Sequence, residues 1–197
     1  MSTSDVWAIT PSVDDDRYRA DASISGAGAL SLITNDAGVN GIGYKVEFTS
    51  AGNDSGRTFT IVGQKVGDLT GTATTEEVTG ASAGAATSTN FYSYIQSISV
   101  DAACAGNVKI GTVGSLALPR TRIRGFQYVG NASAGNISFN LNSTSGAEIL
   151  KVNTPAGATI TQQMSIPGAG ILTTRSNNTD FAIMTLTSVT LITVFCG

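Results

Sequence analysis

Histidine is absent from this 197-residue chain, and its absence excludes several classes of catalytic site. A Ser-His-Asp or Cys-His nucleophile cannot be assembled, and neither can a zinc site that contains histidine. Cysteine is also scarce, since Cys104 and Cys196 are the only two and cannot form a structural zinc site. The sequence therefore predicts a protein that is not an enzyme and that has no catalytic residues, metal or cofactor.

Charge is low as well. Charged residues make up 13% of the chain, against about a quarter in a typical soluble protein. The formal net charge is −3, so the chain lacks the basic excess that nucleic-acid binding requires. No apolar run is long enough for a transmembrane helix, so no membrane partner is expected. The first residues have neither the basic start nor the apolar core of a secretory signal, and we therefore expect both cysteines to be free thiols.

Much of the chain alternates between apolar and polar residues, which is typical of strands with one buried face. Examples are GYKVEFTS (43–50), RTFTIVG (57–63) and GNISFNLN (135–142). No long segment has the 3.6-residue period of an amphipathic helix, and 23 glycines provide turn positions between the alternating runs. The composition and the periodicity together predict an all-β protein.

The spacing of the strands predicts two small antiparallel β-sandwich or jelly-roll-like domains. We expect an extended N-terminal arm in residues 1–21, a first domain in residues 22–114 and a second in residues 115–197. The boundary is placed near residue 115 because SLALPRTRIRGF contains the first proline since Pro11. This segment could be a linker or a strand that crosses between domains. A single large barrel or jelly roll is the alternative architecture.

The tripeptide Ala-Gly-Asn (AGN) occurs three times, at residues 51–53, 105–107 and 134–136, each time beside an alternating segment. Small residues let the chain bend closely, and glycine or asparagine can adopt a positive φ. We therefore interpret the three AGN copies as hairpin turns that mark strand boundaries and carry no chemistry.

Two acidic runs are candidates for carboxylate chemistry. Asp14, Asp15 and Asp16 could bind a hard cation, but they lack the spaced pattern of a calcium loop, and a solvated acidic arm is the simpler interpretation. Glu76 and Glu77 are adjacent in the sequence, and neighbouring strand residues face opposite ways. They are therefore expected on a solvated sheet edge, where they do not form a catalytic pair.

Three arginines form the first candidate partner interface. Arg120, Arg122 and Arg124 alternate along one segment, so in a strand their guanidinium groups share one face. This face could keep an exposed sheet edge from pairing with other chains. Alternatively, it could bind carboxylates of a neighbouring subunit, since arginine is well suited to ion pairs at interfaces.

The predicted arm contains the second candidate interface, formed by Trp7, Ile9 and Tyr18. Trp7 is the only tryptophan of the chain and lies in an otherwise polar stretch. These side chains could pack back on their own domain. They could also anchor the arm in a neighbouring subunit, because a segment that orders on binding needs large apolar groups to offset its entropy loss.

Two stretches resemble virion proteins of tailed bacteriophages. In residues 48–112 the resemblance lies in AGNDSGRTFTIVG, EEVTG and AGNVKIG, and in residues 135–197 it lies in GNISF, PAGAT and TVFCG. Together they cover about two thirds of the chain, and they consist of turns and strands without a catalytic signature. The chain departs from the pattern at its end, FCG, where Cys196 stands at the position that is usually aromatic, before the final glycine.

The resemblance implies a non-enzymatic structural protein of the virion, assembled in the cytoplasm of a host bacterium. The leading expectation is a capsid decoration (cement) protein that binds the major capsid protein and itself, as a symmetric homo-oligomer such as a trimer. The alternative is a tail-associated adaptor or fibre component, or a carbohydrate-binding receptor module that uses Asn177, Asn178 and Asp180. An enzyme is the third and weakest hypothesis, because histidine is absent and carboxylates are few.

Overall fold

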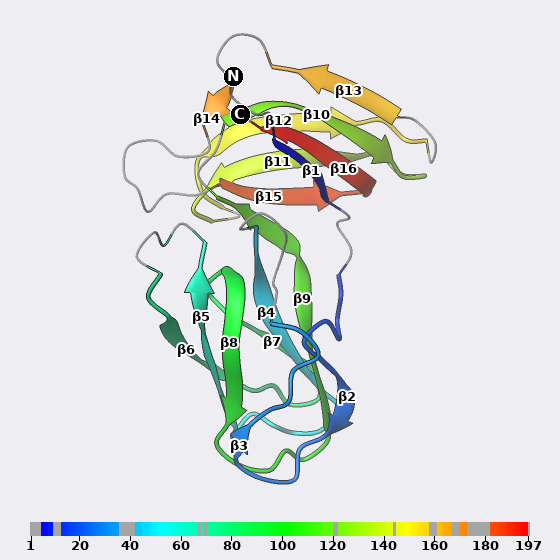
Figure 1. Cartoon of the computed structure of the whole chain (residues 1–197). Coiled ribbons are helices and arrows are strands. Elements are labelled where there is room, and N and C mark those ends of the chain that lie inside the picture. The colour runs from blue at the N-terminus through cyan, green and yellow to red at the C-terminus, as the bar shows by residue number, and fades with distance from the viewer. Residues whose placement is uncertain are drawn as a thin grey trace. The chain divides into compact units, whose positions relative to one another are not determined.

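The computed structural model describes residues 5–9, 13–35, 42–66, 68, 71–119, 122–143, 145–157, 161–166, 170–172 and 182–196. Within these ranges the protein is all-β, as the sequence predicts, and its strands form antiparallel sheets (Figure 1). Contacts divide the chain into two compact units. We call Val13–Val113 the N-terminal unit, and Met1–Ser12 with Gly114–Gly197 the C-terminal unit. The division into an arm and two domains at residues 21 and 114 stays a prediction.

The N-terminal unit is a sheet that curls around its own core. Its strands are β2 (Arg19–Ser23), β3 (Gly28–Ala29), β4 (Gly43–Ser50), β5 (Thr58–Lys65), β6 (Thr74–Thr79), β7 (Ala85–Thr87), β8 (Tyr92–Val100) and the first part of β9 (Asn107–Leu118). Neighbouring strands follow the order β9-β4-β8-β5-β6, while β2, β3 and β7 pair with β9, β8 and β4. Phe48 of β4 stacks on Phe59 of β5 at 4.5 Å between ring centroids, although β8 separates these strands in the sheet.

The core of this unit is formed by the faces that the alternation predicts. Val46 and Phe48 of β4 are buried, and so are Phe59 and Ile61 of β5. Fully burying one such side chain stabilises the folded state by about 1.5–3 kcal/mol. The remaining members of the core come from other strands and from the segment before β2: Tyr18, Ile24, Val78, Tyr92, Ile95, Ile98, Val100, Val108 and Ile110.

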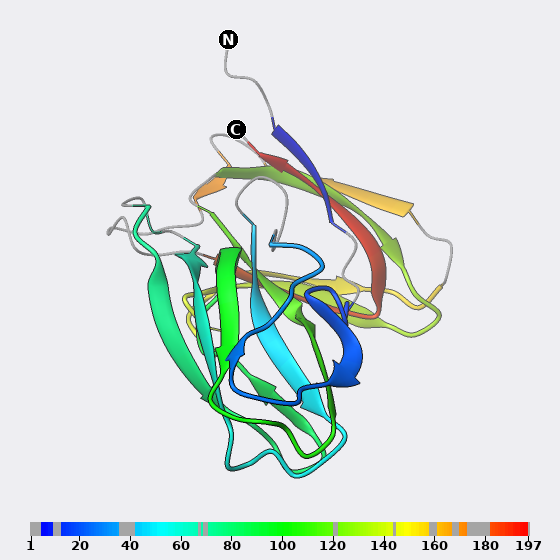
Figure 2. The same cartoon turned by 60° about the horizontal axis from the view of Figure 1, so that its bottom comes forward.

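The C-terminal unit consists of two antiparallel sheets (Figures 1 and 2). Its strands are β1 (Asp5–Ile9), β10 (Arg122–Gly130), β11 (Gly135–Leu141), β12 (Glu148–Thr154), β13 (Thr161–Ser165), β14 (Ile171–Leu172), β15 (Ala182–Thr187), β16 (Val189–Cys196) and the last part of β9. One sheet has the order β1-β16-β10-β13, with β14 also on β10, and the other has β12-β11-β15-β9. Phe126 and Phe139 lie 6.1 Å apart between ring centroids, so the two sheets pack face to face.

β1 forms an edge of its sheet. It pairs with β16 through five register positions that run from Asp5 opposite Cys196 to Ile9 opposite Ile192. Trp7 is the register partner of Val194, whose side chain is fully buried. The first residues of the predicted arm therefore form a strand within the C-terminal unit.

None of the three AGN copies forms a hairpin, so that prediction is wrong. The first copy joins β4 to β5 and the second joins β8 to β9, but neither pair of strands is adjacent in the sheet. The third joins β10 to β11, which belong to different sheets. Their glycines do not have a positive φ either. Glycine is needed here because backbones approach closely: a Cβ on Gly52 would lie 2.6 Å from the nitrogen of Gly106, and a Cβ on Gly135 would overlap the backbone of Thr187.

Candidate functional site

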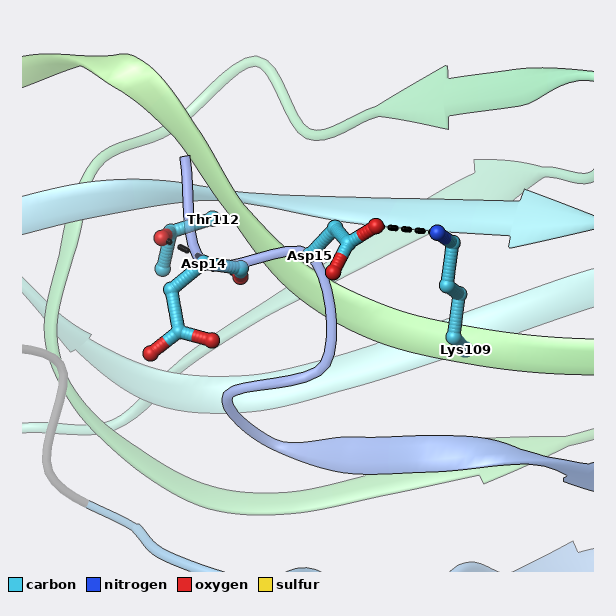
Figure 3. Close-up of polar contacts among 4 residues, drawn as sticks. All are labelled: Asp14, Asp15, Lys109 and Thr112. Atoms are coloured by element: carbon cyan, nitrogen blue, oxygen red, sulfur yellow. Dashed lines mark hydrogen bonds and ion pairs between the residues drawn. The ribbon is translucent and has the colours of Figure 1, made fainter. Parts of the chain in front are cut away.

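The acidic turn, which we define as residues 14–16, fastens the start of the N-terminal unit to β9. The carbonyl oxygen of Asp14 accepts hydrogen bonds from the backbone nitrogen of Thr112 at 2.7 Å and from its hydroxyl at 3.4 Å. The carboxylate of Asp15 forms an ion pair with Lys109, also on β9. Figure 3 shows that the Asp14 carboxylate points away from this pair. It lies 4.0 Å from the guanidinium of Arg17 instead.

The carboxylates of Asp14 and Asp15 therefore bind different basic side chains and do not converge on a common point. Across the described ranges, no three His, Cys, Asp or Glu side chains gather closely enough to hold a metal ion. The pKa of Lys109 is raised, mainly by its hydrogen bond to Asp15 and further by the charges of Asp15, Asp21 and Asp16. Lys109 thus stays protonated, which preserves its ion pair.

Gly111 determines how closely the acidic turn can approach β9. A Cβ at this position would overlap the backbone of Asp14 and Asp15. Backbone atoms cannot move aside as the end of a flexible side chain can. The hydrogen bonds between Asp14 and Thr112 consequently depend on a glycine two residues after Lys109.

Gly111→Ala is expected to destabilise the N-terminal unit by about 2 kcal/mol, because the added methyl group displaces the acidic turn. Lys109→Ala should leave the unfolding free energy nearly unchanged, since its ion pair with Asp15 is exposed to solvent. Urea unfolding followed by circular dichroism measures both effects. Gly26→Ala is the matched control, because a Cβ there meets no atom within 4 Å. Equal effects of Gly111→Ala and Gly26→Ala would contradict the close approach.

Asp54 is a buried carboxylate that links the first two AGN copies. It follows the first copy directly and its side chain is 0% exposed. It accepts hydrogen bonds from the backbone nitrogen of Ala105, at 2.6 Å, and from the hydroxyl of Ser50. The backbone nitrogen of Ala51 also donates to the carbonyl of Asn107 at 2.9 Å. This role of Asp54 was not predicted from the sequence, although only the first AGN copy is followed by aspartate.

The thiol of Cys104 lies beside this junction. Burial raises its pKa, and the negative charge of Asp54 raises it further. The cysteine is therefore protonated at neutral pH, and a protonated thiol is a poor nucleophile. Cys104 and Cys196 are not joined in a disulfide, as the sequence predicts.

Glu76 of the edge strand β6, like Asp54, is a carboxylate that connects two segments through hydrogen bonds. Its carboxylate accepts hydrogen bonds from the backbone nitrogens of Thr89 and Asn90, from the Asn90 side chain at 2.8 Å and from the Tyr92 hydroxyl at 2.9 Å. Burial and this bond to Glu76 together raise the pKa of Tyr92. The prediction of a sheet edge is confirmed and Glu77 is exposed, but Glu76 is half-buried and holds the β7–β8 connection.

Arg122 and Arg124 are exposed on either side of buried Ile123, as the alternation predicts, while Arg120 lies outside the described residues. Their strand is not an edge, because β10 pairs with β16 on one side and with β13 and β14 on the other. The arginines therefore do not protect an edge from pairing, which corrects the simpler interpretation.

The three residues of the second candidate interface do not form one group. Trp7 and Ile9 belong to β1 in the C-terminal unit, and their side chains lie outside the described residues. Tyr18 belongs to the N-terminal unit, where it is fully buried in the core. Asn177, Asn178 and Asp180 of the alternative hypothesis lie outside the described residues as well.

No protein family model, curated protein or solved structure matches this chain. In the part of the chain that the structure describes, no helix has the length and apolarity needed to cross a membrane.

Proposed function

We propose that this protein is a non-enzymatic structural protein of a tailed-phage virion, and specifically a capsid decoration protein. The observation that supports this most directly is the exposed pair Arg122 and Arg124 on the interior strand β10. An interior strand needs no protection against pairing. Exposed arginines at such a position suit recognition of carboxylates on another subunit.

The use of the carboxylates supports the same proposal. Asp15 forms an ion pair, and Asp54 and Glu76 accept hydrogen bonds. Each of these interactions connects two segments of the chain. Carboxylates that are occupied in this way strengthen the fold. A protein that must resist mechanical stress on a capsid surface gains from such cross-links. In this proposal the major capsid protein and other copies of the chain are its partners.

Quantitative mass spectrometry of purified virions tests the proposed location. We expect hundreds of copies per particle, as capsid decoration requires. A dozen copies or fewer would contradict decoration and would point to the tail.

Binding to undecorated heads tests the arginine surface. The double variant Arg122→Glu and Arg124→Glu should bind at least about tenfold more weakly, the effect of losing about 1.4 kcal/mol. Lys151→Glu is the matched control, because Lys151 is also an exposed cation of the C-terminal unit, on β12. Equal loss of binding in the control and the double variant would show that net charge matters and that the β10 surface does not.

A further inference from the structure

β1 belongs to the C-terminal unit by its contacts, but it is far from that unit along the chain. The whole N-terminal unit, Val13–Val113, lies between β1 and the remaining strands of its own unit. Pairing with β16 is the interaction that places β1, through five register positions. β1 and β16 are not neighbours in the sequence. The β16 strand of another copy therefore offers β1 the same binding site.

Because β1 is an edge strand, the sheet loses only the pairing with β16 when β1 is removed. β16 keeps its other neighbour, β10, through register pairs from Ile123 opposite Cys196 to Gly130 opposite Val189. Removing an edge strand therefore opens one row of backbone hydrogen-bonding groups on β16. Such a row is a template for a strand from another chain.

The acidic turn holds the other end of this segment in place. Asp14 and Asp15 are fastened to Thr112 and Lys109 of β9, within the N-terminal unit (Figure 3). Only residues 10–13 separate this anchored segment from β1. Short connections of this kind favour exchange of the terminal element between copies.

We propose that β1 is exchanged between copies, so that Asp5–Ile9 of one copy pairs with β16 of the next. The partner is a second copy of this chain, because β16 with the register of Val194 opposite Trp7 exists only there. This inference rests on the proposed function only in requiring several copies side by side. The exchanged strand then links the subunits of the oligomer through backbone hydrogen bonds.

Disulfide trapping of the full chain tests the exchange. Asp5→Cys places a thiol opposite the natural Cys196, and Ala8→Cys with Thr193→Cys creates a second facing pair. Antiparallel partners alternate between closely and widely spaced side chains, and these two pairs are three residues apart. One of the two pairs is therefore of the closely spaced type, which a disulfide can bridge.

We expect mild oxidation of the purified oligomer to give covalently linked chains in a non-reducing denaturing gel. Disulfides that close within single chains would overturn the exchange, and so would a protein that stays monomeric at every concentration. Failure of both pairs to form any disulfide would show that β1 does not lie on β16, which also overturns it.

Mixing two single variants gives an independent measurement. Copies with Ala8→Cys and copies with Thr193→Cys are dissociated, mixed and reassembled before oxidation. Exchange predicts a disulfide that joins the two variants. Thr190→Cys is the matched control for Thr193→Cys, because Thr190 is exposed on β16 but lies outside the register with β1. Equal cross-linking by Thr190→Cys would overturn the assigned register and the exchange with it.

The result separates this inference from the proposed function. Exchange in solution by a protein that is absent from virions would refute the virion role alone. A virion protein whose disulfides all form within single chains would refute the exchange alone.

Discussion

Gly106→Ala is expected to destabilise the N-terminal unit by about 3 kcal/mol, and Gly52→Ala by a similar amount. The two glycines belong to the first two AGN copies, and their backbones are in close contact. A Cβ on Gly52 would be 2.6 Å from the nitrogen of Gly106. Each methyl group would meet backbone atoms of the opposite copy. The two segments would have to move apart, which would also lengthen the hydrogen bond from the Ala51 nitrogen to the Asn107 carbonyl.

The measurement is urea unfolding followed by circular dichroism. Gly56→Ala serves as the matched control, because it lies in the same β4–β5 connection and a Cβ there meets nothing within 4 Å. The control should stay within about 0.5 kcal/mol of the natural protein. If Gly52→Ala and Gly106→Ala were as mild as Gly56→Ala, the close packing of the two AGN copies would be refuted.

Asp54→Ala is expected to cost about 3 kcal/mol for a different reason. The substitution leaves the backbone nitrogen of Ala105 without its acceptor and removes the bond from the hydroxyl of Ser50, whose other acceptor is the Gly52 carbonyl at 3.1 Å. Asp54→Asn should cost less, because its remaining carbonyl oxygen can still accept the bond from Ala105. Thermal and urea unfolding measure this order of stabilities.

Asp101→Ala is the control for Asp54→Ala. Asp101 lies in the β8–β9 connection with Ala105, but its side chain is exposed. Its loss should leave the stability nearly unchanged. A double variant with Ser50→Ala should be less destabilised than the sum of the two single changes, since both remove the same hydrogen bond. Additive effects would argue that Ser50 and Asp54 act independently.

The strands could be predicted because their signal is local. The alternation in GYKVEFTS predicts a strand with one buried face, and β4 covers the same residues with Val46 and Phe48 buried. The exposed positions of Arg122 and Arg124 follow from the same alternation. A period of two residues reports which side chains share a face, and it does so without knowledge of the neighbouring strands.

The strand order could not be predicted in this way. AGN looked like a hairpin turn because small residues beside a strand usually indicate one, but here each copy leads to a strand that is not its neighbour. The tether formed by Glu76 was missed for the same reason. Its partners Thr89, Asn90 and Tyr92 are 13–16 residues away, and only the fold brings them to the edge of β6.

The course of β9 has a consequence for how the gene can be divided. β9 runs without interruption through the border between the units, pairing with β2 near Val108 and with β15 near Ala117. A fragment that ends at the border cuts β9 after Val113 and contains β1 without its partner β16, and a fragment that begins there lacks β1. The second half of the coding sequence therefore does not specify a complete C-terminal unit, and recombination could not shuffle the two halves as independent modules.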